Sequence, residues 1–147
     1  MIFPAFTLPA SNGTTVSDRD FQTGTTVLYL YPKDSTPGCT IEAQDFRDLA
    51  ADFQRIGVAI FGLSKDSLKA HESFCTKYTL NFPLLSDEDH TLIKALGAWK
   101  EKTRFGKKYF GTERSTFIIC NGEIVHEWRA VKVTGHATEV LKFCQSL

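Results

Sequence analysis

The chain has 147 residues, of which 42% are hydrophobic and 23% charged, and its 17 basic and 17 acidic side chains give a formal net charge of zero. A chain of this length and composition forms one ordinary domain with its own core, and it is neither disordered nor collagen-like. Zero net charge argues against a nucleic-acid or anionic-membrane partner. No apolar stretch approaches the ~20 residues of a membrane helix. We therefore expect a single domain over residues 1–147 that binds neither nucleic acid nor membranes.

The N-terminal segment MIFPAFTLPA contains no Lys or Arg, and Pro4 and Pro9 interrupt its apolar residues. A signal peptide needs a basic region followed by an unbroken apolar run. We therefore expect a cytoplasmic protein whose four cysteines are free, catalytic or metal-bound rather than paired in structural disulfides. Slightly further along, Asn12-Gly13 predicts a small hairpin.

Strand and helix patterns then alternate along the chain. Residues 25–31 are β-branched or aromatic and nearly all apolar, which predicts a buried strand ending at Pro32. From 37 to 56 the apolar residues recur at spacings of three and four, which predicts a helix that stops at Gly57. Residues 58–63 predict a second buried strand.

A second helix is expected next. Ser64 or Asp66 is a suitable N-cap, and the helix runs to about Tyr78 with Leu68 and Cys75 near one face. This helix would carry Cys75, one of the four cysteines.

The rest of the chain adds a hairpin and a closing helix to this pattern. The remaining elements are a short connector over 83–86, a helix over 87–96, a long loop over 98–113, strands over 115–120 and 123–129, and a helix over 136–147. Asn121-Gly122 between the two strands predicts a two-residue turn. We expect an α/β fold, a thioredoxin-like three-layer sandwich with a mixed central sheet, helices on both faces and a small N-terminal hairpin.

Cys39 lies where the first strand passes into the first long helix. The connecting segment is YPKDSTPGCT, and Pro37 with Gly38 forms a turn, so Cys39 is expected in the first helical turn. Unpaired N–H groups and the helix dipole there favour a thiolate over a thiol. The dipole contributes at most about 2 kcal/mol, so a cation or direct hydrogen bonds must supply the rest.

Three further residues are candidates for that support. Thr36 can place its hydroxyl near the sulfur or near a small oxygen substrate, and Pro32 can shield the site from water. Arg114, just before a predicted strand, is a candidate guanidinium. The alternative is that Cys39 is a small buried hydrophobe, which is the usual role of a free cysteine.

The segment YPKDSTPGCTIEA resembles the active-site signature of peroxiredoxins, and within them the bacterioferritin-comigratory or peroxiredoxin Q subfamily. The segments FTLPASNGTTVS, GLSKDS, KYTLNFPLLSD, LGAW, FGKKYFGTERSTFII and NGEI resemble that subfamily in the same order. The resemblance implies that Cys39 is the peroxidatic cysteine, that Thr36 hydrogen-bonds the peroxide, that Pro32 shields the site and that Arg114 stabilises the thiolate and the departing oxygen.

The resemblance also bears on the second cysteine. A common subfamily pattern places a resolving cysteine five residues after the first, but that position is Gln44 here. Other members carry it on the next helix, where Cys75 stands 36 residues after Cys39, and we assign Cys75 as the resolving thiol. The alternative is that Cys75 only packs in the core.

A disulfide needs Cα atoms about 4.4–6.8 Å apart, and two helices over a sheet seldom hold two positions that close. We therefore expect local unwinding around Cys39 and Cys75 on oxidation. Cys120 and Cys144 are interpreted as structural, although the sequence alone leaves other pairings open.

The expected activity is reduction of hydrogen peroxide and alkyl hydroperoxides by a monomer, with thioredoxin or a glutaredoxin-like dithiol as the reductant implied by the resemblance. We expect no cofactor and no metal, because only His71 and Cys75 have ligand spacing on one helix. The basic and aromatic residues of 98–114 are interpreted as a solvated loop. The alternatives are a one-cysteine peroxidase that uses an external thiol and a non-enzymatic redox-sensing domain.

Overall fold

A five-stranded central sheet organises the protein in the computed structural model, which describes all 147 residues. The strand order is β5-β4-β3-β8-β9. The three strands β3, β4 and β5 run parallel, while β8 and β9 are antiparallel to their neighbours. The strands are β3 (Thr25–Leu30), β4 (Val58–Ser64), β5 (Leu84–Ser86), β8 (Ser115–Cys120) and β9 (Glu123–Trp128).

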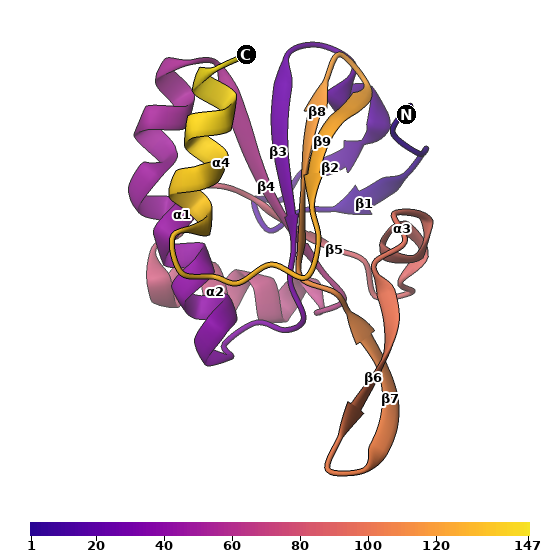
Figure 1. Cartoon of the computed structure of the whole chain (residues 1–147). Coiled ribbons are helices and arrows are strands. Elements are labelled where there is room, and N and C mark those ends of the chain that lie inside the picture. Colours follow the sequence, from indigo (N-terminus) through magenta and orange to yellow (C-terminus); the bar gives the residue numbers. More distant parts are fainter.

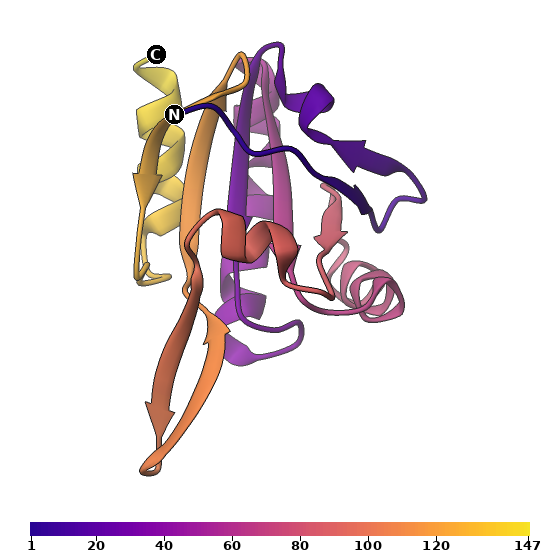
Figure 2. The ribbon, with the colours of Figure 1, turned by 90° about the vertical axis from the view of Figure 1, so that its right-hand side faces the viewer.

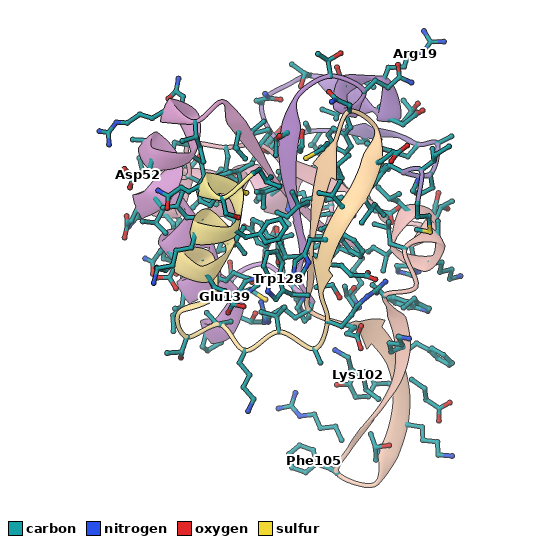
Figure 3. The ribbon with its side chains drawn as sticks, turned by 45° about the horizontal axis from the view of Figure 1, so that its top comes forward. Arg19, Asp52, Lys102, Phe105, Trp128 and Glu139 are labelled. Atoms are coloured by element: carbon teal, nitrogen blue, oxygen red, sulfur yellow. The ribbon has the colours of Figure 1, made fainter.

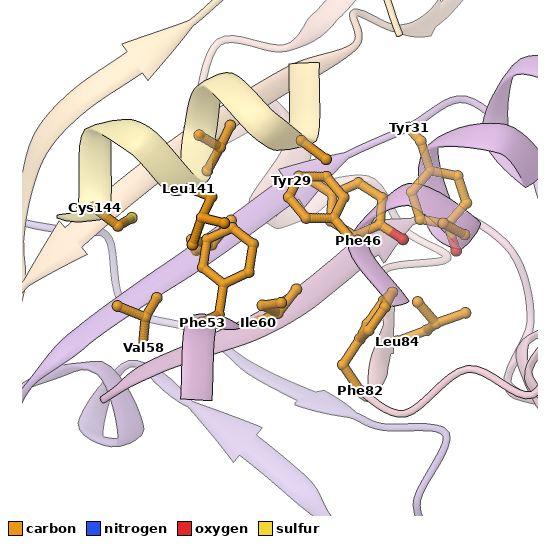
Figure 4. Close-up of a cluster of buried hydrophobic side chains, with 14 of the residues drawn as sticks. Tyr29, Tyr31, Phe46, Phe53, Val58, Ile60, Phe82, Leu84, Leu141 and Cys144 are labelled. Atoms are coloured by element: carbon orange, nitrogen blue, oxygen red, sulfur yellow. The ribbon is translucent and has the colours of Figure 1, made fainter. Parts of the chain in front are cut away.

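Three helices pack on one face of this sheet: α1 (Pro37–Arg55), α2 (Leu68–Tyr78) and α4 (His136–Gln145). Figure 1 shows α1 and α4 side by side against the strands, with α2 crossing below them. The core between these layers is aromatic, and Tyr29 of β3 stacks on Phe46 of α1 with ring centroids 4.7 Å apart (Figure 4). None of the helices is both long enough and apolar enough to cross a membrane.

The opposite face is covered by smaller elements: the hairpin β1 (Thr7–Pro9) and β2 (Thr15–Ser17), the 3-10 helix η1 (Asp18–Phe21) and the short helix α3 (Thr91–Ala95). Phe21 of η1 is fully buried and packs against Phe3, Phe6 and Phe61. The predicted three-layer α/β sandwich with a mixed sheet and an N-terminal hairpin is therefore confirmed.

Most predicted elements are confirmed, but the cap of α2 differs from the expectation. Ser67, rather than Ser64 or Asp66, is the N-cap, and its side chain accepts a hydrogen bond from the Ala70 amide. The Ser64 and Asp66 side chains instead bond to each other at 2.5 Å. The residues that α2 buries are His71 and Phe74, and Cys75 is only half-buried.

Two short elements were also misjudged. The expected connector over 83–86 is the parallel edge strand β5, which is too short to show a strand pattern. The expected helix over 87–96 is reduced to α3, because His90 takes a left-handed conformation. The segment before α3 is instead organised by the Asp87 carboxylate, which accepts a hydrogen bond from the Ile93 amide.

The largest correction concerns the expected loop over 98–113. It is a two-stranded hairpin of β6 (Trp99–Arg104) and β7 (Lys107–Thr112), called the arm below, which projects away from the body in Figure 2. Figure 3 shows Phe105 at its tip, where it is 90% exposed. The arm has no buried face along most of its length, so its sequence lacks the alternation that marks a half-buried strand.

Candidate active site

Cys39 lies in the first turn of α1, as predicted. The helix begins at Pro37, a residue suited to a first helical position, and Thr36 is the N-cap in extended conformation. The first helical hydrogen bond joins the Thr40 amide to the Thr36 carbonyl at 2.9 Å. The Cys39 amide therefore belongs to the group of first-turn N–H donors that have no partner within the helix.

A guanidinium reaches the Cys39 sulfur. Arg114, just before β8, donates from Nη2 to Sγ of Cys39 at 3.3 Å and from Nη1 to Oε1 of Glu42 at 2.6 Å. Gly38 permits this close approach, since a Cβ at that position would lie 3.3 Å from Nη2 of Arg114. The cation that the sequence analysis required beside Cys39 is thus present.

Glu42 was not singled out from the sequence. It lies one turn after Cys39 on α1, is 1% exposed, and its second oxygen Oε2 has no hydrogen-bond partner. Burial raises the pKa of Glu42 to about 7, and the Arg114 charge offsets only part of that effect. The charge that competes with Cys39 for the guanidinium therefore titrates near neutral pH. A carboxylate three residues after a helix-start cysteine was the available sequence signal.

Arg114 stays charged in this surrounding. Burial by itself lowers its pKa, but the charges of Glu42 and Cys39 outweigh burial and raise the pKa above its ordinary value. The ion pair is well shielded from solvent, because the Arg114 side chain is 16% exposed. A shielded, permanently charged donor is suited to stabilising negative charge on sulfur or oxygen.

Thr36 and Pro32 lie in the loop between β3 and α1, and neither is hydrogen-bonded to the Cys39 sulfur. The Thr36 hydroxyl donates to the Lys33 carbonyl at 2.8 Å, and Pro32 is half-buried. Cys39 itself is 1% exposed.

Cys75 occupies a different surrounding on α2. Its sulfur donates to the Ser11 hydroxyl at 3.5 Å and lies beside a cavity of about 270 Å³ formed with Leu80 and Asn81. Burial, the largest effect, raises the pKa of the Cys75 thiol, and the Asp34 charge raises it further, while the Ser11 hydrogen bond acts in the opposite direction. The Cys39 and Cys75 sulfurs are thus held by different partners, and both cysteines are free.

A buried polar cluster that the sequence analysis missed connects the surroundings of the two cysteines. Atoms of Asp34, Asp66 and His71 lie within 4.8 Å of one another, the spacing of a potential metal site. Both His71 nitrogens already have oxygen partners, however, namely the Asp34 carboxylate and the Leu85 carbonyl. His71 faces this cluster, whereas Cys75 faces Ser11, so the two do not act as the ligand pair that their spacing suggested.

The remaining cysteines lie away from Arg114. Cys144 of α4 is buried, and burial, together with a smaller effect of Cys120, raises its pKa to about 11. The Cys120 sulfur is 3.5 Å from the Thr25 hydroxyl at the end of β8. Neither is hydrogen-bonded to a cation, whereas Cys39 is.

Comparisons with known proteins agree with this geometry. The model of the AhpC/TSA family matches residues 2–127. Peroxiredoxin Bcp of Xanthomonas campestris is 48% identical over 135 residues, covering 91% of this chain and 84% of that protein. Peroxiredoxin Bcp of Bacillus subtilis is 46% identical over 140 residues, covering 95% of this chain and 89% of that protein.

The similarity extends to solved structures. A structure of the Xanthomonas campestris bacterioferritin comigratory protein, described as a trapped intermediate/ligand complex that gives insight into its alkyl peroxide reduction activity, has a TM-score of 0.91 at 44% identity. The match covers 96% of this chain and 90% of the chain in that structure. Structures of two cysteine-to-serine variants of Xanthomonas campestris peroxiredoxin Q have TM-scores of 0.92 and 0.91.

Proposed function

This chain belongs to the AhpC/TSA family and is a peroxiredoxin, and from that premise we propose that it reduces hydrogen peroxide and organic hydroperoxides through Cys39 and Cys75. The observation that carries the proposal is the contact of 3.3 Å between the Arg114 guanidinium and the Cys39 sulfur in the first turn of α1. The alkyl peroxide reduction described for the Xanthomonas campestris relative supports the substrate class.

In the first step, the Cys39 thiolate attacks one oxygen of the peroxide. An S–O bond forms, the O–O bond breaks, and the departing oxygen takes up a proton and leaves as water or an alcohol. Arg114 stabilises the sulfur before the attack and the negative charge on the departing oxygen during it. In this proposal Thr36 turns its hydroxyl from Lys33 to the peroxide, and Pro32 keeps water from the sulfur.

In the second step, Cys75 resolves the Cys39 sulfenic acid. The Cys75 sulfur attacks Sγ of Cys39, an S–S bond forms, the S–O bond breaks, and the hydroxyl leaves as water. The two cysteines exchanged in the Xanthomonas campestris variants are separated by the same number of residues as Cys39 and Cys75, which supports this pairing. Since the two sulfurs have different partners, the pairing requires local unwinding of both segments.

A dithiol reductant such as thioredoxin or a glutaredoxin-like protein then returns both cysteines to the thiol form by exchange. The proposal assigns the whole cycle to one domain over residues 1–147, working in a reducing compartment such as the cytoplasm, where four free cysteines persist.

Stopped-flow measurement of the first turnover with hydrogen peroxide tests both steps. Cys39→Ser is expected to abolish the reaction, whereas Cys75→Ser is expected to keep sulfenic acid formation and lose the disulfide. Cys144→Ser, a buried cysteine without a cation, serves as the matched control. Peptide mass mapping should find Cys39 joined to Cys75 in the oxidised wild type.

Three other outcomes would contradict parts of the proposal. Cys39 joined to Cys120 or Cys144 would overturn the assignment of the resolving residue. Full turnover of Cys75→Ser with thioredoxin would favour a one-cysteine peroxidase with an external thiol. A Cys39 reaction no faster than that of a free thiolate would favour a redox-sensing domain.

A further inference from the structure

The segments that carry Cys39 and Cys75 are tied together by one buried contact. Asp34 stands five residues before Cys39 in the loop leading to α1, and His71 stands one turn before Cys75 on α2. Nδ1 of His71 lies 2.6 Å from Oδ2 of Asp34, and the two side chains are 0% and 4% exposed. This contact is therefore shielded from water.

Each end of this contact is anchored further. On the loop side, the Tyr31 hydroxyl donates to Oδ1 of Asp34 at 2.6 Å, and the Asp34 amide donates to Oδ2 of Asp66 at 2.9 Å. On the helix side, Nε2 of His71 lies 2.9 Å from the Leu85 carbonyl oxygen of β5. The contact therefore fixes the loop and the helix to the carboxyl ends of neighbouring strands.

The hydrogen-bond pattern defines the protons that the contact holds. A carbonyl oxygen only accepts, so Nε2 of His71 carries a hydrogen for Leu85. A single proton then lies between Nδ1 of His71 and Oδ2 of Asp34, and the bond keeps strong charge-assisted character. Breaking it leaves Oδ2 of the buried Asp34 without its His71 partner and leaves Nδ1 of His71 with only the Tyr31 hydroxyl, 3.5 Å away, which is costly.

We infer that His71 is a positioning residue that, through its bond to Asp34, latches the Cys75 helix to the Cys39 loop and sets the rate of disulfide formation after peroxide has reacted. The inference rests on the proposed two-cysteine cycle. A Cys39–Cys75 disulfide needs Cα atoms within 4.4–6.8 Å, and both segments must unwind to reach that distance. The Asp34–His71 bond holds both segments in their folded conformations, so it opposes this unwinding and breaks when they unwind.

The latch has a consequence for the fate of the sulfenic acid. While it stays closed, Cys39 remains beside Arg114 and a second peroxide can convert the sulfenic acid to a sulfinic acid, with an S–O bond formed and an O–O bond broken. Once it opens, Cys75 competes for the same sulfur. The strength of the bond thus determines how the protein divides between resolution and over-oxidation.

Two amide substitutions separate the two bonds of His71. His71→Gln keeps a donor near the position of Nε2 for Leu85 but loses the bond to Asp34, whereas His71→Asn keeps a donor near the position of Nδ1 for Asp34 but loses the bond to Leu85. Glu72→Gln, at an exposed neighbouring position on α2, is the matched control.

The full-length reduced protein is mixed with one equivalent of hydrogen peroxide, quenched with an alkylating reagent and analysed by mass spectrometry.

Disulfide formation in His71→Gln is expected to be roughly tenfold or more faster than in wild type, because a charge-assisted hydrogen bond no longer opposes unwinding. Cys39 oxidation should change less than twofold, and the sulfinic fraction at excess peroxide should fall. Glu72→Gln should resemble wild type, and His71→Asn, which loses only the bond to Leu85, should accelerate clearly less than His71→Gln. Equal rates in a folded His71→Gln, or equal acceleration in His71→Asn, would overturn the latch.

If His71→Gln fails to fold, as judged by circular dichroism, Asp34→Asn probes the same bond from the loop. It should accelerate disulfide formation in the same direction, and an unchanged rate overturns the inference. Absence of a Cys39–Cys75 disulfide in the oxidised wild type would instead contradict the proposed function itself.

Discussion

Cys39 and Cys75 lie in the same hydrophobic layer, but their sulfurs have opposite surroundings. Cys39 stands in the first turn of α1 with a guanidinium 3.3 Å from Sγ. Cys75 stands in the second half of α2, beside a neutral hydroxyl at 3.5 Å, and burial raises the pKa of its thiol. The difference supports the proposal that Cys39 attacks first, because thiolate is favoured by a cation and a helix N-terminus and disfavoured by burial alone.

Cys144 shows what burial does when no cation is present. It is nearly as buried as Cys39, and burial raises its pKa to about 11. The exposed fraction therefore does not distinguish Cys39 from Cys144. The charged partner of Cys39 does, and that partner is Arg114.

The largest expected effect is the loss of Arg114. Arg114→Met removes the donor to Sγ of Cys39 and to the departing oxygen, and removal of one such donor typically lowers a rate 10²- to 10³-fold. We expect stopped-flow oxidation of Cys39 to slow by about this factor. Arg114→Lys keeps the charge but loses the guanidinium fork that donates to both Cys39 and Glu42. Its Cys39 oxidation rate should therefore lie between those of wild type and Arg114→Met.

Glu42 gives the next largest effect, on stability. A carboxyl with a raised folded pKa holds its proton more tightly when folded, so its contribution to stability is greatest below about pH 4.5 and is lost as pH rises through about 7. The loss amounts to about 3 kcal/mol. Glu42→Gln cannot titrate, so urea unfolding between pH 4 and 8 should show the wild type losing about this much more than the variant. Parallel pH profiles would mean that folding does not raise the pKa of Glu42.

The catalytic centre was more accessible to sequence reasoning than the parts around it. The position of Cys39 in the first turn of α1 was predicted because a turn made by Pro37 and Gly38 precedes a helical pattern, and helix starts have known electrostatics. Arg114 followed from the need for a cation and from the family signature. The helix-start pattern at Cys39 and the family signature at Arg114 can both be identified without knowledge of the tertiary fold.

What the sequence did not reveal depends on contacts between distant segments. The partnership of Asp34 and His71 joins positions 37 residues apart, and nothing in either neighbourhood specifies the other. The strands of the arm were missed for another reason, because cross-strand hydrogen bonds rather than a buried apolar face hold them together. Phe105-Gly106, with positive φ at both residues, was the one turn signal available there.

A smaller effect is expected in the pH dependence of the reaction of Cys75 with an alkylating reagent. Its pKa lies above the ordinary value of 9.0, so the thiolate fraction in the folded, reduced protein rises about tenfold per pH unit up to pH 9. Peptide-resolved iodoacetamide labelling measures this slope. The same chain in guanidinium chloride is the control, in which the profile should begin to level near pH 9. A plateau below pH 9 in the folded protein would mean that burial does not raise the pKa of Cys75, and the contrast with Cys39 would be lost.

The smallest effect is expected at the tip of the arm, which contacts neither cysteine. Phe105 is 90% exposed, so Phe105→Ser removes almost no buried surface and should change stability by less than about 0.5 kcal/mol. Cys39 oxidation and Cys75 disulfide formation should both stay within twofold of wild type in the same stopped-flow assay. A slower Cys39 reaction would show that the arm takes part in closing the peroxide site, and the reactivity of Cys39 could then no longer be assigned to α1 and Arg114 alone.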